Sequence, residues 1–138
     1  MNQEQYLKNL SVPTGKVDVI LDTDTFNEID DQFALSYLLL SGEKLRTRAI
    51  CAAPFLNQHS TSPADGMRRS YDEILKLLAL LKTDLPVFHG SESYLADEKT
   101  PVISDAARVI ADTAAEYSPE NPLYVVAIGA ITNVASAI

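Results

Sequence analysis

The stretch that decides the fold is VDVILDTDTFNEIDD, residues 17–31. Its beginning is apolar apart from Asp18, as in a buried strand, and an apolar helical run follows from residue 30. Four aspartates lie where the strand gives way to the helix: Asp22, Asp24, Asp30 and Asp31. In open parallel sheets, ligands bind where strands end and helices begin. The stretch therefore predicts a metal site or a catalytic carboxylate cluster at the carboxyl end of a strand.

The rest of the chain repeats this alternation of strand and helix. We expect strands at about 17–22, 46–53, 85–89 and 123–128, and helices at about 30–41, 64–82, 103–117 and 131–138. The strands are apolar throughout, which is typical of a parallel sheet covered on both faces by right-handed crossovers. The sequence thus predicts a doubly wound α/β fold with a mainly parallel sheet and flanking helices.

Composition narrows the functional classes. The chain has 138 residues, of which 46% are hydrophobic, so we expect one domain with a substantial core over residues 1–138. A net charge of −8 without a basic stripe argues against nucleic-acid binding. No apolar run reaches roughly 18 residues, and the N-terminus lacks the pattern of a signal peptide. We therefore expect no membrane partner, a cytoplasmic location and, for the single Cys51, a place in the core.

The last segment, residues 129–138, reads as an apolar helix that stops without a glycine or a basic last turn. A helix that is apolar on most sides needs more protein to cover it. A fragment, a truncated reading frame and an obligate oligomer would each satisfy that need. We favour truncation, and we also expect a homo-oligomer.

The chemistry of the aspartate cluster follows from charge. Neighbouring carboxylates repel one another, and a hard cation with oxygen ligands stabilises them in the ionised form. Ca²⁺ suits a cluster without His or Cys. Asp22 and Asp24 are two residues apart and share a strand face, whereas Asp30 and Asp31 at a helix start can cap free N–H groups and still turn outward. The alternative is that Asp30 is merely an N-cap.

These motifs resemble the nucleoside hydrolases, the inosine-uridine preferring N-ribohydrolases, whose signature is an apolar strand followed by Asp-x-Asp-Pro-Gly-x-Asp-Asp. The four aspartates match that signature, AAPFLN at 52–57 matches a post-strand Asn, and VAIGAITNVA at 126–135 matches a Gly-Pro-Leu-Thr-Asn segment. The resemblance covers the N-terminal half of a family enzyme. It implies a Rossmann-like core that cleaves ribonucleosides to ribose and free base.

The resemblance also implies roles for single residues. Asp24 would bind Ca²⁺ and act as the general base for the attacking water, and Asp31 would bind the ion through both oxygens. Asp30 would hold a ribose hydroxyl, and Asn57 would orient the water and the sugar. The main-chain carbonyl of Ile128 would be a further calcium ligand. Asp22 would support Asp24 from behind.

Two departures from the family pattern qualify these roles. Residues 25–29 put five positions between Asp24 and Asp30 where the common motif has three, so that Asn27 and Glu28 come within reach of the ligand. The family's last Asp calcium ligand and its leaving-group acid belong to a C-terminal half that this sequence lacks. We therefore keep a non-catalytic domain that binds calcium or ribose as an alternative.

A second enzyme class also places Asp-x-Asp after its first strand. In haloacid-dehalogenase-like phosphatases, Asp22 would be the nucleophile and Asp24 the acid, with Mg²⁺ bound. Phe26 replaces the usual Thr or Val, and Asp30 and Asp31 would have no role, so this class is less favoured.

The remaining polar residues have simpler interpretations. His89 is expected to be an ordinary surface or core histidine, and His59 a weak candidate for ligand contact because it follows Asn57. Arg68, Arg69 and Lys76 are expected on the solvated face of a long helix.

Overall fold

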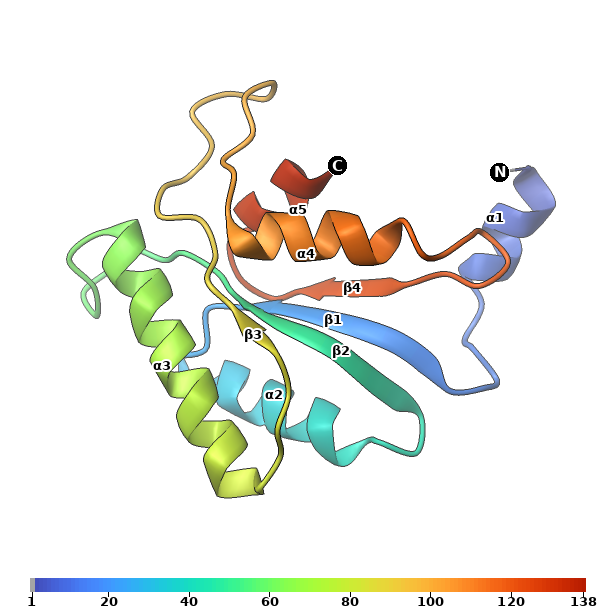
Figure 1. Ribbon diagram of the computed structural model, residues 1–138, viewed down its shortest axis with the longest axis horizontal. Helices are drawn as coiled ribbons and strands as arrows, with labels where there is room; N and C mark the ends of the chain where they lie inside the picture. Colours follow the sequence, from blue (N-terminus) through green and yellow to red (C-terminus); the bar gives the residue numbers. More distant parts are fainter. Residues whose placement is uncertain (1) are drawn as a thin grey trace.

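The computed structural model describes residues 2–138 and confirms the doubly wound α/β fold (Figure 1). The elements in chain order are α1 (Gln3–Asn9), β1 (Val17–Thr23), α2 (Ile29–Leu40), β2 (Leu45–Ala52), α3 (Pro63–Leu81), β3 (Val87–Phe88), α4 (Asp105–Ala114), β4 (Tyr124–Ala127) and α5 (Thr132–Ala137). None of the helices within this described range has both the length and the hydrophobicity required to span a membrane.

The four strands form one sheet in the order β3-β2-β1-β4, and all neighbouring strands are parallel. The chain moves outward from β1 through β2 to β3 and then returns to place β4 on the other side of β1. The strand order therefore reverses between β1 and β4. In folds of this kind, the carboxyl ends of the strands at the reversal point form the ligand-binding crevice.

Helices cover the sheet on both faces, because alternate side chains of each strand point to opposite sides. On one face, α2 and α3 pack against β1 and β2 around Leu21, Leu35, Ile50 and Ile74. On the other face, α4 and α5 cover Ile20, which is fully buried with Cys51 as predicted. Figure 1 shows the two helix pairs on opposite sides of the strands.

The element boundaries differ from the prediction at three points. The helix α1 was not expected; it begins at the N-cap Asn2, whose side chain accepts a hydrogen bond from the amide of Gln5 (2.8 Å). The strand β3 has only two residues, although the Pro86 carbonyl before it still accepts from the Ile50 amide (3.0 Å). The helix α4 starts later than predicted because Ser104 is its N-cap.

An ion-pair network surrounds Asp18 near the amino end of β1. Asp18 is 8% exposed and accepts hydrogen bonds from Arg46 and from the Tyr117 hydroxyl, with Arg48 3.7 Å away. The Arg46 hydrogen bond holds the pKa of the Asp18 carboxyl below its usual value, against the opposing effect of burial. A buried carboxylate at this end of the strand is therefore compensated by cations of the chain itself.

Gly66 in α3 fixes the distance between this helix and the loop after β2. A Cβ at this position would lie 2.1 Å from the carbonyl oxygen of Phe55, a separation that the backbone can relieve only by moving. We predict that Gly66→Ala lowers the free energy of unfolding by roughly 2 kcal/mol or more, as overpacking does. Urea denaturation measures this loss.

Gly42 provides the matched control. Its added Cβ would meet no atom closer than 3.8 Å, so Gly42→Ala is expected to leave the midpoint of unfolding nearly unchanged. Equal losses in the two variants would contradict the close packing of α3 against the loop.

Candidate functional site

The predicted carboxylates gather at the carboxyl end of β1, beside the reversal point of the sheet. Asp22 belongs to the strand, which ends at Thr23, and Asp24 begins the loop to α2. The main-chain carbonyl of Asp22 accepts from the amide of Ile128 (2.9 Å), just beyond β4. The segments that carry the predicted site residues of β1 and β4 therefore lie side by side.

Asp22 is the most deeply buried member of the cluster. It is 0% exposed, and its Oδ1 accepts a hydrogen bond from Asn133 Nδ2 (2.8 Å). Its Oδ2 is buried without a hydrogen-bond partner among residues 2–138. Burial raises the pKa of Asp22 to about 7, opposed by the Asn133 hydrogen bond and reinforced by the charge of Asp24. The carboxyl therefore keeps a proton in the fold at a pH where an ordinary Asp is ionised.

Asp24 follows the end of β1, and the loop after Asp24 holds its side chain. Its Oδ2 accepts from Asn27 Nδ2 (3.0 Å), and the Asn27 side-chain oxygen accepts in turn from Asn57 Nδ2. The Asn57 oxygen then accepts from the His59 amide (2.8 Å). Burial raises the pKa of Asp24, against the Asn27 hydrogen bond. Asn27, which the sequence placed within reach of a ligand, thus contacts the proposed base and connects it to Asn57.

Asp31 is turned into the protein instead of outward as expected. It lies one helical turn before Leu35 on the core side of α2, is 6% exposed, and accepts at Oδ1 from the Thr23 hydroxyl (2.6 Å). Burial raises its pKa to about 6, opposed by the Thr23 hydrogen bond and reinforced by the charges of Asp24, Asp30 and Glu28. These charge effects show that the carboxylates share one electrostatic environment.

Asp30 does not cap the helix. The N-cap of α2 is Glu28, whose side chain makes no capping hydrogen bond, and Asp30 is an exposed residue of the first turn. The prediction that Asp30 or Asp31 caps α2 is therefore wrong, because the helix begins at Ile29 and both aspartates lie inside its first turn. Asp30 and Glu28 instead add negative charge at the solvent side of the cluster.

The absence of a side chain at Gly129 leaves room for the Asp24 carboxylate. A Cβ at Gly129 would lie 2.8 Å from Asp24 Oδ1 and 3.2 Å from the Cβ of Ala53. Only a residue without a side chain leaves this oxygen uncovered on the β4 side. The main chain after β4 therefore passes directly beside the carboxylate that the sequence proposed as base and metal ligand.

No cation within residues 2–138 compensates these four aspartates. Among residues 2–138, none of the ion pairs between Lys, Arg or His and a carboxylate involves Asp22, Asp24, Asp30 or Asp31. Asp18, at the opposite end of the same strand, is paired with arginine. Within that same range, no three His, Cys, Asp or Glu side chains are grouped closely enough to hold a metal ion by themselves. Main-chain oxygens, water or ligand atoms would have to complete a cation site.

Asn133 organises the surroundings of the cluster, a role that the sequence reasoning did not assign to it. It is fully buried, donates to Asp22 and to the Ala52 carbonyl (3.2 Å), and accepts from the amide (2.8 Å) and hydroxyl of Ser91. A Cβ on Gly90 would lie 2.6 Å from its Nδ2. The sequence signal was an amide residue in an otherwise apolar helical run.

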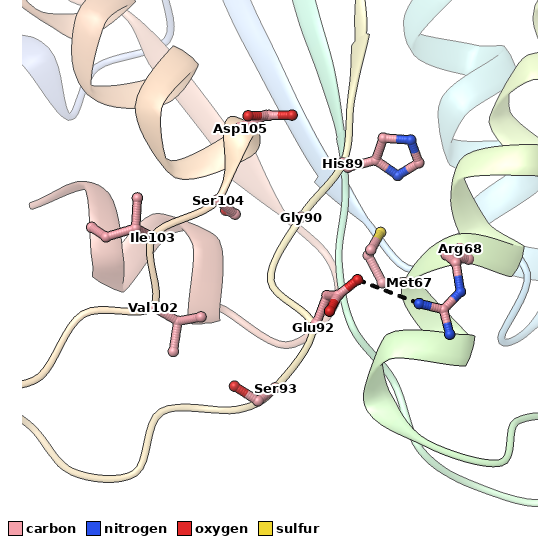
Figure 2. Close-up of a pocket in the computed structure, with 10 residues that line it drawn as sticks. All are labelled: Met67, Arg68, His89, Gly90, Glu92, Ser93, Val102, Ile103, Ser104 and Asp105. Carbon is pink, nitrogen blue, oxygen red and sulfur yellow. Dashed lines mark hydrogen bonds and ion pairs between the residues drawn. The ribbon is translucent and has the colours of Figure 1, made fainter.

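A cavity of about 580 Å³ lies beyond the carboxyl end of β3 rather than at the aspartates (Figure 2). Arg68 and Glu92 form an ion pair in its lining (3.4 Å), and His89, which also lines it, stacks on Tyr71 with ring centroids 3.7 Å apart (Figure 2). His89 is exposed at this position. The basic residues of α3 pair with neighbouring acids on the solvated face, and His59 is exposed.

A comparison with models of known protein families, with curated proteins and with solved structures finds no match to this chain.

Asp22 gives the protein a pH-dependent stability with a defined sign. The folded state retains a proton that the unfolded chain releases above its ordinary pKa of 3.8, so stability is full below that pH and falls as the pH rises to about 7. A pKa raised this far corresponds to a free energy of unfolding that is roughly 4 kcal/mol lower at pH 8 than at acidic pH. We predict that Asp22→Asn, measured with chelator present, is more stable than the original chain at pH 8 but not at pH 4.

Urea unfolding at several pH values measures this difference. The control is Asp97→Asn, because hydrogen bonds from the amides and hydroxyl of Lys99 and Thr100 lower the pKa of that exposed carboxyl. Its stability profile should keep the decline between pH 4 and 8. A flat profile in the unsubstituted chain would refute the raised pKa of Asp22.

Proposed function

We propose that this chain provides a calcium-dependent site for cleaving the N-glycosidic bond of ribonucleosides, giving ribose and free base. The observation that carries the proposal is the buried group of Asp22, Asp24 and Asp31, which has no compensating cation from residues 2–138. Like charges in a buried site favour the uptake of protons or of a cation. The order of motifs along the sequence supports the same family of reactions.

The residues at the site have the type of ligand atom that Ca²⁺ prefers. The side chains at the site offer oxygen atoms, and Ca²⁺ takes six to eight such ligands. Asp24 and Asp31 would hold the ion with the carbonyl of Ile128, and Gly129 leaves Asp24 Oδ1 uncovered for this purpose. Because two carboxylates do not complete the shell, water and sugar hydroxyls would supply the rest. Bound there, the ion would lower the pKa of a coordinated water.

The chain's own groups would then carry out the proton transfer. Asp24, whose burial makes it more basic than an ordinary Asp, takes a proton from the attacking water while Asn27 holds its second oxygen. The water oxygen bonds to the anomeric carbon as the carbon–nitrogen bond breaks. The departing base takes a proton from solvent and Asp24 returns one, so that the net reaction consumes one water.

Two further residues would position the sugar. Asp30 is exposed at the edge of the cluster, where its carboxylate can accept from a ribose hydroxyl. Asn57 is exposed and connected to Asp24 through Asn27. Glu28 adds a second acceptor at the same edge.

The geometry argues against the phosphatase alternative. That chemistry requires Asp22 to attack phosphorus, but Asp22 is 0% exposed and hydrogen-bonded to Asn133. A nucleophile must reach its substrate, whereas Asp22 is in a position to support Asp24. The non-catalytic alternative, a domain that binds only calcium or ribose, is distinguished by experiment.

Calorimetric titration of Ca²⁺, with and without ribose, tests the binding part of the proposal. We predict binding that ribose tightens and that Asp31→Asn weakens at least about tenfold, as loss of a metal-site residue does. Asp112→Asn, an exposed position on α4, is the matched control and should bind like the original chain. Absence of binding in the unsubstituted chain would contradict the calcium site.

Release of ribose from inosine and from uridine tests the catalytic part. We predict release that chelator abolishes and that Asp24→Asn reduces by about 10²-fold or more, the usual contribution of a general base. Circular dichroism should show both Asp variants folded. Calcium binding without ribose release would establish the non-catalytic alternative instead.

A further inference from the structure

Two buried threonines at the end of β1 have no part in the proposed reaction. Successive side chains of a strand point to opposite faces, so Asp22 and Thr23 lie on opposite sides of the sheet. Asp22 accepts from Asn133 of α5, whereas Thr23 donates to Asp31 in the first turn of α2. Thr25, in the loop that follows, contacts Thr23, and both threonines are 0% exposed. We call Thr23 and Thr25 the hydroxyl pair.

The hydroxyl pair forms two successive hydrogen bonds that end on Asp31. Thr25 Oγ1 lies 2.9 Å from Thr23 Oγ1, which donates to Asp31 Oδ1 at 2.6 Å. A hydroxyl has one proton, and an ionised carboxylate can only accept. Because Thr23 gives its proton to Asp31, Thr25 must be the donor to Thr23. Both bonds therefore point toward the carboxylate, and aligned bonds of this kind strengthen one another in a buried site.

The hydroxyl pair leaves one oxygen of Asp31 without a partner. Among residues 2–138, Asp31 Oδ1 accepts from Thr23, but no group donates to Oδ2. This Oδ2 still reaches solvent, because Asp22 Oδ2 is the one buried side-chain atom in the same range that lacks a partner. The bond at Oδ1 restricts rotation of the carboxylate about Cβ–Cγ, so that Oδ2 keeps its direction. A cation at the cluster can therefore take this oxygen without breaking the bond to Thr23.

We propose that Thr23, supported by Thr25, is a positioning residue that holds Asp31 ready for the calcium ion, an inference that rests on the proposed function. With the carboxylate already fixed in the metal-free protein, less side-chain freedom is lost when the ion binds. Hydrogen bonds of this kind to a ligating carboxylate are typically worth about tenfold or more in metal affinity. Neither hydroxyl is exposed to substrate. The hydroxyl pair thus acts on calcium affinity and not on the chemical step.

The competing explanation is that the hydroxyl pair only fastens α2 to β1. Thr23 is the last residue of the strand and Asp31 lies in the first turn of the helix, so their hydrogen bond joins the two elements. Both explanations predict that loss of the Thr23 hydroxyl lowers the free energy of unfolding. They differ in calcium affinity, which depends on the hydroxyl only if Thr23 positions Asp31.

Calorimetric titration of Ca²⁺ into Thr23→Val separates the two explanations. Valine keeps the shape of threonine and suits a strand, but it leaves Asp31 Oδ1 without its donor. We expect Ca²⁺ affinity to fall about tenfold or more in Thr23→Val and to stay within about twofold in Thr23→Ser, which keeps the hydroxyl. Thr25→Val should cause a smaller loss, because it removes only the second hydrogen bond.

Thr47→Val is the matched control. Thr47 is a half-buried residue of β2 whose hydroxyl makes no hydrogen bond within residues 2–138, and its affinity should equal that of the original chain. Circular dichroism checks that each variant is folded. If Thr23→Val does not fold, Thr25→Val and Thr23→Ser carry the same test, since only the first of them should lose affinity.

Ribose release from inosine at increasing Ca²⁺ gives a second measurement. We expect saturating Ca²⁺ to restore release by Thr23→Val, because Thr23 does not touch the reacting atoms, whereas Asp24→Asn should stay slow at every Ca²⁺ concentration. Calorimetry alone decides if the chain binds Ca²⁺ without releasing ribose.

The outcomes distinguish the positioning role from the proposed function. Calcium binding that is equally tight in Thr23→Val and in the original chain would overturn the positioning role and leave the proposed function standing. Equal losses in Thr23→Val and Thr23→Ser would overturn it as well, because the hydroxyl would then not be the group that matters. Absence of calcium binding in the original chain would refute the proposed function, and this inference with it.

Discussion

Burial of carboxylates without a compensating cation is the constraint on which the carboxyl end of β1 depends. Asp22, Asp24 and Asp31 are each at most 6% exposed. In water each would be ionised at neutral pH, and burial beside one another makes that state costly. The structure relieves the cost with side-chain hydrogen bonds from Asn133, Asn27 and Thr23 and with raised pKa values. A bound divalent cation would relieve it more completely.

The two ends of β1 differ in how their buried carboxylates are compensated, and this difference supports the proposed function. Asp18 at the amino end is buried nearly as deeply, yet Arg46 and Arg48 compensate it and its pKa is lowered. The carboxyl end has no such pair among the residues that the structure describes, and it lies at the reversal point where doubly wound sheets bind ligands. Gly129 keeps the main chain after β4 close to Asp24 without covering it. An uncompensated charge at that place costs stability, which is typical of sites built for a ligand.

The sequence predicted the fold because largely apolar strand segments alternate with helical segments along the chain, and α3 and α4 begin at serine N-caps. It also predicted that Asp22, Asp24, Asp30 and Asp31 lie near the carboxyl end of β1, where the structure places them. It could not predict that Asp31 turns inward, since that depends on where α2 begins, and Glu28 at the N-cap carries no capping signal. Nor could it predict the hydrogen bonds of Asn133 to Asp22 and Ser91, because these join segments far apart in the chain. The helix α1 was not predicted because its sequence has no apolar stripe.

A carbon-13 NMR titration of the aspartate side chains, first with chelator and then with Ca²⁺, tests the central claim most directly. With chelator, we expect Asp22 to titrate at a pH of about 7 and Asp31 at about 6. With Ca²⁺, we expect the midpoints of Asp31 and Asp24 to fall, because a ligated carboxylate resists protonation. Ordinary midpoints with chelator, or midpoints that Ca²⁺ leaves in place, would contradict the claim that these carboxylates form a cation site.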